Sequence, residues 1–264
     1  MGKKMSNAPV YYTVAQVQFN PILNLDSYLP AIQSQMREAH FPDYKQEAIQ
    51  QLIFPFGGNE AGQATAPKLA SQSRFTFGDI EGRSGFSLES NALSFHTTAY
   101  DTFEIFLASL LKGLGILHGA LRLDFIERIG LRYLDAVQPA IKGDSLGDYL
   151  ATEVFGLTQK LGGSLMHTVS ETVTITNAGQ LVSRVIIRNG SIGLPPELSA
   201  LAPKIDPRFT QRECLHAIVD TDASFGQREV FDLKKIEARL LALHEEIKKS
   251  FDATVTEHAL AIWA

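Results

Sequence analysis

Two carboxylates, Asp220 and Asp222, are the first residues in this sequence whose type and spacing could bind a metal. They follow residues that predict a β-strand, and the alternation of side chains along a strand places both on one side. Oxygen ligands of this kind are the ones that hard divalent cations use. Acidic residues at the rim of a sheet also serve solubility alone, and this second interpretation is the one we favour. The sequence therefore predicts no metal and no cofactor, with Asp220 and Asp222 as the candidates if a cation binds.

Arginine side chains form the second candidate site. Arg128 and Arg132 lie four residues apart in one expected strand, and Arg184 and Arg188 lie four apart in another, so each pair faces one side of its strand. If the two strands are neighbours, these rows could hold a nucleic-acid backbone or an acidic loop of another protein. The rows could equally be the solvated side of a half-buried sheet. The counter-ions would then be Glu127, Asp135 and Glu171.

Signatures of catalysis are missing. No glycine-rich phosphate loop follows a strand and opens a helix, and no serine stands in the glycine-flanked elbow of the α/β-hydrolases. The segment His244–Lys248 resembles the start of a zinc-protease helix but has lysine where the second histidine ligand is needed. Cys214 and His216 would share one face of a strand, yet no third group is available to orient the histidine. We therefore expect no catalytic residues and lean towards a protein that is not an enzyme.

The first half of the chain predicts a strand, a helix, a set of short strands and a second helix. The second helix begins at Asp101, and Gly113 and Gly115 are expected to end it. Residues 42–72 contain several prolines and glycines and are expected to be irregular, apart from a short helical stretch near Gln46–Ile53. The expected strands are Tyr11–Phe19, Arg74–Phe77, Gly85–Leu88 and Ala92–Thr97.

The second half repeats this order of elements and closes with a long amphipathic helix. Apolar residues from Leu233 to Phe251 are spaced by three and four, which forms a narrow apolar seam that is expected to pack on the chain's own sheet. A short helix ending near Trp263 follows. The remaining elements are expected at Leu121–Val137 (strand), Leu146–Phe155 (helix), and Ser164–Thr176, Gln180–Arg188 and Cys214–Asp220 (strands).

These elements predict an α+β fold made of two pseudo-repeated halves. Each half would be an antiparallel sheet with helices on one face. The expected units are an N-terminal half, residues 1–118, and a C-terminal half with the closing helices, residues 119–264. The two sheets could pack as one continuous unit.

Composition narrows the partners and the compartment. The 264 residues carry 29 acidic and 24 basic side chains, a net charge of −5, which disfavours broad binding to nucleic-acid phosphates. A single cysteine fits a reducing compartment. Met1–Pro9 lacks the apolar stretch of a secretory signal, and the apolar run Ile105–Leu117 is shorter than a membrane span. We expect a cytoplasmic protein that does not bind membranes.

The C-terminal region resembles the closing signature of a sporadically distributed, functionally uncharacterised prokaryotic family. Arg128–Tyr133 resembles that family's central strand and Val14–Phe19 its opening strand. The family has no established activity, so the resemblance implies no catalytic residues, and its patchy distribution is similar to that of genes for phage defence or toxin neutralisation. His244 would be a signature position, with a helix-capping or inter-helix hydrogen bond as its expected role. The signature residues are Leu240–His244, Phe251, Ala253–Glu257 and Trp263.

Three hypotheses follow for the function. The first is a non-catalytic protein of a bacterial accessory module that binds another macromolecule, with a protein favoured over nucleic acid, as an antitoxin-like, immunity-like or phage-defence component. The second is an RNA-binding or RNA-processing protein with tandem ferredoxin-like halves, in which the arginine rows contact nucleic acid. The third is a metal-dependent hydrolase that uses Asp220 and Asp222. A homodimer is compatible with each of them.

Overall fold

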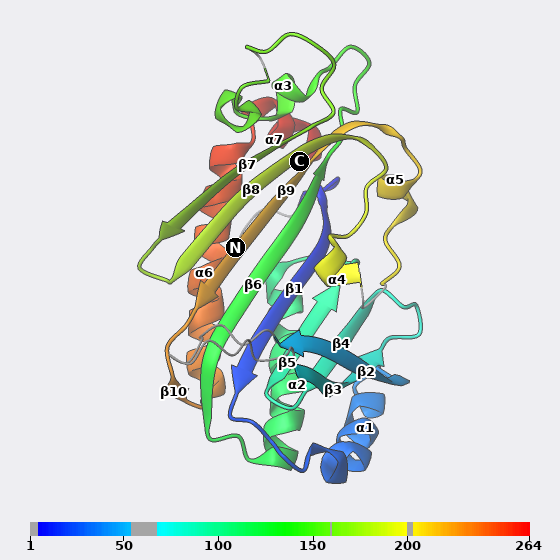
Figure 1. The fold of residues 1–264 in the computed structure, drawn as a ribbon, viewed down its shortest axis with the longest axis vertical. Helices are drawn as coiled ribbons and strands as arrows, with labels where there is room; N and C mark the ends of the chain where they lie inside the picture. The colour runs from blue at the N-terminus through cyan, green and yellow to red at the C-terminus, as the bar shows by residue number, and fades with distance from the viewer. Residues whose placement is uncertain (1–4, 54–67, 159, 200–202) are drawn as a thin grey trace, which may run out of the picture.

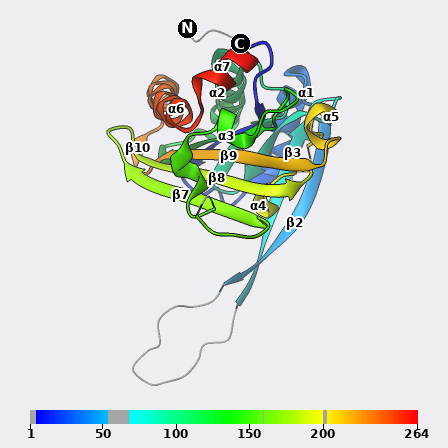
Figure 2. The same ribbon diagram turned by 90° about the horizontal axis from the view of Figure 1, so that it is seen from above.

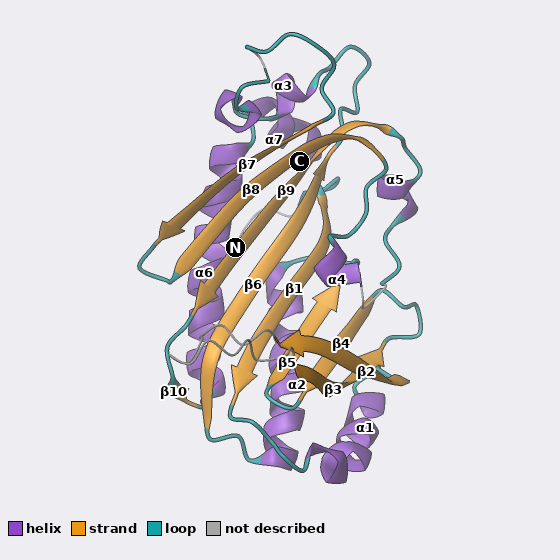
Figure 3. Cartoon of the chain, viewed as in Figure 1, coloured by secondary structure: helices purple, strands orange, loops and turns teal. Residues whose placement is uncertain are grey.

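One ten-stranded antiparallel sheet organises the molecule, and its long helices lie on one face (Figures 1 and 3). The computed structural model describes residues 5–53, 68–158, 160–199 and 203–264. The strand order is β2-β3-β4-β5-β1-β6-β9-β8-β7, with β10 paired to β6. The strands are β1 (Val10–Phe19), β2 (Asp43–Ile53), β3 (Lys68–Gly78), β4 (Ser84–Glu89), β5 (Ala92–Thr97), β6 (Phe125–Val137), β7 (His167–Ile175), β8 (Gln180–Gly190), β9 (Cys214–Phe225) and β10 (Glu229–Val230). The helices are α1 (Leu29–Glu38), α2 (Phe103–Leu121), α3 (Leu146–Tyr149), α4 (Pro196–Ser199), α5 (Pro207–Thr210), α6 (Leu233–Thr254) and α7 (Glu257–Trp263), with 3-10 turns at Leu25–Tyr28 and Thr152–Phe155.

The centre of the sheet is the pair β1 and β6. Both strands are rich in β-branched and aromatic residues, which fit a pleated, half-buried surface. Ala15, Val17 and Phe19 of β1 point into the core beneath the helices, and the alternate residues point to the other face. Strands of the first half of the chain extend the sheet from β1, and strands of the second half extend it from β6. The expected boundary at residues 118 and 119 falls inside α2, close to its C-terminal end.

Helices α2 and α6 cover the core face of the sheet. Asp232 caps α6 by accepting hydrogen bonds from the backbone N–H groups of Lys234 and Lys235. The residues of α6 that are buried against the sheet recur every three or four positions, which is the spacing of one helix face. They are Ile236, Leu240, Leu243 and Ile247.

Helix α2 is long and apolar enough to cross a membrane by length and composition alone. A core helix of a water-soluble domain has the same properties, and Phe106, Leu110, Leu114 and Leu117 of α2 are buried in the largest core cluster. Contrary to expectation, Gly113 does not end this helix, which continues to Leu121. A Cβ at Gly113 would lie 2.3 Å from Cε1 of Phe86, so glycine is required for the close approach of α2 to β4.

His244 joins α6 to two neighbours in the middle of the helix. Its ring stacks on Phe103 of α2, with 3.9 Å between the ring centroids, and its Nδ1 shares a 3.3 Å hydrogen bond with the hydroxyl of Tyr133 on β6. The expected helix-capping or inter-helix hydrogen bond is therefore wrong in its partner. The contact with the other helix is ring stacking, and the hydrogen bond goes to the sheet.

Two segments differ from the sequence-based expectation. Gln46–Ile53 was expected to be helical but belongs to β2, which pairs with β3 from Asp43–Gly78 to Ile53–Lys68. Pairing over the full strand length overrides the local helix preference of these residues. Figure 2 shows the far ends of β2 and β3 extending away from the body of the sheet on the side opposite α2 and α6. The expected helix Leu146–Phe155 consists of α3 followed by a separate 3-10 turn. The expectation that residues 42–72 are irregular is wrong for 43–53 and 68–72, which belong to β2 and β3, and residues 54–67 lie outside the described residues.

Replacing two glycines of α2 by alanine should have opposite effects on stability. Gly113→Ala should lower the free energy of unfolding by about 1–3 kcal/mol, because the new methyl group overlaps the ring of the buried Phe86. Gly119 has no atom within 4 Å of an added Cβ, so Gly119→Ala should raise the free energy of unfolding by about 0.5–1 kcal/mol through helix propensity. Urea unfolding monitored by circular dichroism measures both, and equal effects would contradict the packing described here.

Candidate functional site

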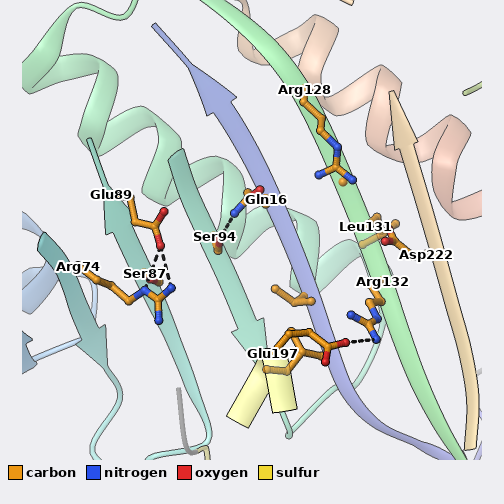
Figure 4. A pocket seen from close by; sticks show the side chains of 13 residues that line it. Gln16, Arg74, Ser87, Glu89, Ser94, Arg128, Leu131, Arg132, Glu197 and Asp222 are labelled. Atoms are coloured by element: carbon orange, nitrogen blue, oxygen red, sulfur yellow. Dashed lines mark hydrogen bonds and ion pairs between the residues drawn. The ribbon is translucent and has the colours of Figure 1, made fainter. Parts of the chain in front are cut away.

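The face of the sheet opposite α2 and α6 holds the arginines and aspartates that the sequence singled out. We call it the open face. The loop between β8 and β9 covers one end of it, where Ile192 and Phe209 pack on Leu134 and Ile218. Next to this covered end lies a hollow of about 220 Å³, and among the described helices only α4 reaches it. Figure 4 shows the side chains that line it: Gln16, Arg74, Ser87, Glu89, Ser94, Arg128, Arg132, Glu197 and Asp222 are those with polar groups.

Asp220 of β9 is the centre of an ion-pair network on the open face. Its carboxylate accepts hydrogen bonds from Nε (2.7 Å) and Nη2 (2.8 Å) of Arg132 on β6 and from Nη1 (3.0 Å) of Arg184 on β8. Arg132 also donates to Glu197 of α4 at 3.0 Å, and Arg184 donates through Nε to Glu171 of β7 at 2.7 Å. The chain of charges therefore crosses four strands, with two arginines shared among three carboxylates.

The ion pair between Asp220 and Arg132 is the buried part of this network. The Asp220 side chain is 2% exposed and that of Arg132 is 14% exposed. Burial acts to lower the pKa of Arg132, but the hydrogen bonds and charge of Asp220 raise it above its ordinary value. The pKa of Arg184 is also raised, because Glu171 and Asp220 outweigh the effect of burial. Both guanidinium groups stay charged and fixed in place.

The expected neighbouring arginine strands are not neighbours. Arg132 lies in β6 and Arg184 in β8, and β9 separates these two strands. The carboxylate of Asp220 on β9 lies between the two guanidinium groups and pairs with both, because buried like charges need a counter-ion. Local sequence gives the side to which each arginine points but not which strand lies between them.

Arg128 and Arg188 are the other two arginines of the expected rows. Among the described residues, neither makes a hydrogen bond or an ion pair. The guanidinium of Arg128 lies over Gly130, where an added Cβ would be 3.0 Å from its Nη1. Arg188 is exposed and lies opposite His216 of β9. These two arginines keep their charges available for a partner.

The expected counter-ions are distributed differently. Glu171 pairs with Arg184 as expected. Glu127 instead pairs with Arg228 of the segment before β10. Asp135 does not reach the arginines, because it lies at an odd position of β6 and points to the face covered by helices. The counter-ions that the sequence analysis did not identify are Asp220 and Glu197.

Asp220 and Asp222 lie inside β9, not at its end, and share the open face as expected. Both oxygens of Asp220 already accept hydrogen bonds from arginines. Burial raises the pKa of Asp222, while Arg128 and Arg132 act to lower it, and its carboxylate has no hydrogen bond within the described ranges. In the same part of the chain, no three His, Cys, Asp or Glu side chains are grouped as metal ligands. The geometry therefore assigns Asp220 to ion pairing.

The opposite side of the hollow is built from first-half strands that the sequence analysis did not connect to a site. Arg74 of β3 pairs with Glu89 of β4 at 2.9 Å, and Nε2 of Gln16 on β1 donates to Oγ of Ser94 on β5 at 3.1 Å. Alternation along β1 was a signal for Gln16. Arg74, Glu89 and Ser94 become neighbours of the site only through the order of the strands in the sheet.

The hydroxyl groups of the hollow lack a neighbouring histidine base among its lining residues. Its serines, Ser87 and Ser94, have no histidine among the lining residues that could act as a base. His96 follows on β5, but it is buried beside Tyr12, and burial lowers its pKa to about 4. The hollow offers hydrogen-bond donors, acceptors and fixed charges.

Removing the charge of Asp220 should be far more damaging than removing that of Asp222. Asp220→Asn leaves Arg132 and Arg184 without their shared counter-ion and should lower the free energy of unfolding by about 3 kcal/mol or more. Asp222→Asn is the matched control. Because burial raises its pKa, the ionised form of Asp222 destabilises the fold, and the neutral amide should leave stability unchanged or slightly higher at neutral pH. Thermal and urea unfolding of both variants checks this, and equal losses would contradict it.

Comparison with known proteins leaves the open face as the main guide to function. No protein-family model matches this chain, and no curated protein matches its sequence.

Proposed function

We propose that this chain is a non-catalytic binding protein that recognises another protein through the open face of its sheet. The observation that carries the proposal is the balance of charge in the hollow. Its lining contains three arginines and three carboxylates, set among one neutral amide, that of Gln16, and the hydroxyls of Ser87 and Ser94. Such a mixed surface suits the polar groups of a folded protein, because each charge can meet an opposite one.

Fixed geometry supports recognition of one specific partner. Arg132 is held by Asp220 and Glu197, and Arg74 by Glu89, so these side chains lose little conformational entropy when a partner binds. Arg128 and Asp222 flank the same hollow without hydrogen bonds to other described residues. They would supply the charged contacts of the interface.

The organisation into halves belongs to the same proposal. Strand order supports it, because the first half contributes β2-β3-β4-β5-β1 and the second half contributes β6-β9-β8-β7, so each half places its first strand at the centre. The hollow spans this junction, with lining residues from β3, β4, β5 and β1 on one side and from β6 and β9 on the other. A partner would therefore contact both halves at once. Helix α6, with its buried seam, would act as a scaffold behind the second half.

A role in a bacterial accessory module, as an antitoxin-like, immunity-like or phage-defence component of the cytoplasm, is the wider form of this proposal. It is supported by the resemblance of the C-terminal signature, and the single cysteine is compatible with the compartment.

Site-specific cross-linking tests the binding face directly. A photoreactive amino acid at Ser94, on the open face, should form a covalent adduct with one protein at native expression levels. The same amino acid at Ser34, exposed on α1, should not form that adduct. Arg128→Glu in the Ser94 background should reduce the adduct by roughly tenfold or more, because it reverses a charge at the hollow.

Arg37→Glu on α1 is the matched charge reversal and should leave the adduct unchanged. Thermal unfolding of each variant ensures that a loss of adduct reflects the interface. Absence of a protein adduct from Ser94, or equal adducts from Ser34 and Ser94, would overturn the proposal.

RNA binding is the second candidate, and the unpaired state of Arg128 and Arg188 favours it. Neutralisation of Arg132 and Arg184 by carboxylates weighs against it, because phosphate binding requires uncompensated positive charge. Filter binding with total cellular RNA distinguishes the candidates. We expect no retention above that of a neutral control protein at about 0.1–0.2 M salt. Retention that falls with salt and is lost in the Arg128→Glu, Arg188→Glu double variant would establish the RNA alternative instead.

A further inference from the structure

A second cavity lies on the other side of the sheet, separate from the open face. Its volume is about 350 Å³, it opens to solvent, and it is lined by the start of α2, by α6, by β6 and by the segment that leads into β1. This is large enough for a small organic molecule. Its walls include the aromatic rings of Tyr100, Phe103, Tyr133 and Phe251. We call it the helix-side cavity.

Asp135 is a buried carboxyl group without a partner in the wall of this cavity. Its side chain is 7% exposed, and it makes no hydrogen bond or ion pair with any described residue. Burial, followed by the charge of Asp220, raises its pKa to about 7. A buried ionisable group with no partner costs stability, so its presence at this position needs an explanation beyond packing.

The neighbouring polar groups cannot neutralise Asp135. The hydroxyl of Tyr133 is engaged with the hydroxyl of Tyr100 at 3.1 Å and with Nδ1 of His244 at 3.3 Å. Burial lowers the pKa of His244, so its ring is neutral at pH 7. Burial and the nearby Tyr100 raise the pKa of Tyr133 well above its ordinary value, so this phenol is neutral as well.

Charge around the cavity is predominantly negative. The lining contains four carboxyl groups, those of Asp101, Glu104, Asp135 and Glu245, against one lysine, Lys248. Asp101, Glu104, Glu245 and Lys248 are exposed, so Asp135 is the buried carboxyl group that would attract a cation into the cavity. Aromatic walls favour an organic cation over a metal ion, because ring faces attract ammonium groups while a metal requires several oxygen or nitrogen ligands.

We propose that the helix-side cavity binds a small organic ammonium ion, whose charged group pairs with Asp135 and whose apolar part packs against Tyr100, Phe103 and Tyr133. This site is independent of the open face, so either can fail without the other. The ligand would provide the opposite charge that Asp135 lacks, through a charge-assisted hydrogen bond in a low-dielectric environment. Because the cavity touches α2, α6 and β6, the bound ligand would also link the helix layer to the sheet.

Calorimetry with three matched probes on the full chain tests the proposal. Phenethylamine, 2-phenylethanol and 3-phenylpropionate share a phenyl group but are cationic, neutral and anionic. Phenethylamine should bind at least roughly tenfold more tightly than either of the others. Equal binding of the alcohol and the amine, tighter binding of the acid, or no binding of the amine would overturn it.

Substitution of Asp135 identifies the counter-ion. Asp135→Asn keeps the shape of the side chain and should weaken phenethylamine binding by roughly tenfold or more. Asp222→Asn removes a carboxylate on the opposite face and should leave binding unchanged. Circular dichroism and thermal unfolding report whether Asp135→Asn folds, and unchanged affinity in the folded variant would overturn the assignment.

Proton linkage gives a second test that needs no variant. Binding of the amine requires the ionised form of Asp135, so the protein should release a proton on binding at about pH 6 and none at about pH 8.5. Calorimetry in buffers of different ionisation enthalpy measures this release. No proton release at the lower pH would overturn the pairing with Asp135.

Other titratable groups lie near Asp135. The lowered pKa of His244 and the raised pKa values of the tyrosines keep these groups neutral across most of this range. The titratable groups that line the cavity with Asp135 are Tyr100 and Asp101 from the segment before α2, Glu104 from α2, Tyr133 from β6, and His244, Glu245 and Lys248 from α6. Tyr11 of β1 and Asp220 of β9 lie on the open-face side and interact with Asp135 electrostatically through the sheet.

Discussion

The pairing of β1 with β6 determines the face of the sheet to which each side chain near the centre of the molecule points. Alternation sends Ala15, Val17 and Leu131 under the helices and Gln16 and Arg132 to the opposite side. The apolar set anchors α2 and α6, and the polar set must find partners across neighbouring strands. Both the core and the open face therefore depend on the register of this one pair. The two cavities are its consequences, one on each side of the sheet.

Local sequence pattern predicted those elements whose pattern agrees with their environment. β1 alternates, and the buried residues of α6 recur at helical spacing, so each can be recognised from a short window. The prediction of a helix at Gln46–Ile53 was wrong because the local pattern and the environment disagree. Its glutamines, glutamate and alanine favour a helix, while β3 pairs with it along the whole strand. The prediction that Gly113 ends its helix was wrong because this glycine is needed for a contact with Phe86, which is far away in sequence. Strand order is a property of the whole chain and could not be read from any one segment.

The candidate site divides in the same way. The alternation of side chains along a strand predicted that Arg132 and Asp222 would each point to one face of its strand. It did not predict that β9 would lie between the two arginine strands. The charge balance of the open face, on which the choice between a protein and RNA depends, is therefore a tertiary property. Asp135 was expected to serve as a counter-ion of the arginines, although it lies three positions from Arg132 and alternation places it on the other face. The sequence contained that signal, and its consequence is the unpartnered carboxyl group of the helix-side cavity.

The position of Asp220 between Arg132 and Arg184 has a consequence for how the sheet is assembled. A slip of β9 by one residue would turn every side chain of that strand to the opposite face. Asp220 would then enter the apolar layer beneath α6 without a partner, and Arg132 and Arg184 would keep only the more exposed Glu197 and Glu171 as counter-ions. A buried carboxylate without a partner and the loss of its two ion pairs make the misaligned sheet less stable than the native one. The ion-pair network therefore favours the native alignment of β9, whether or not the open face binds a partner.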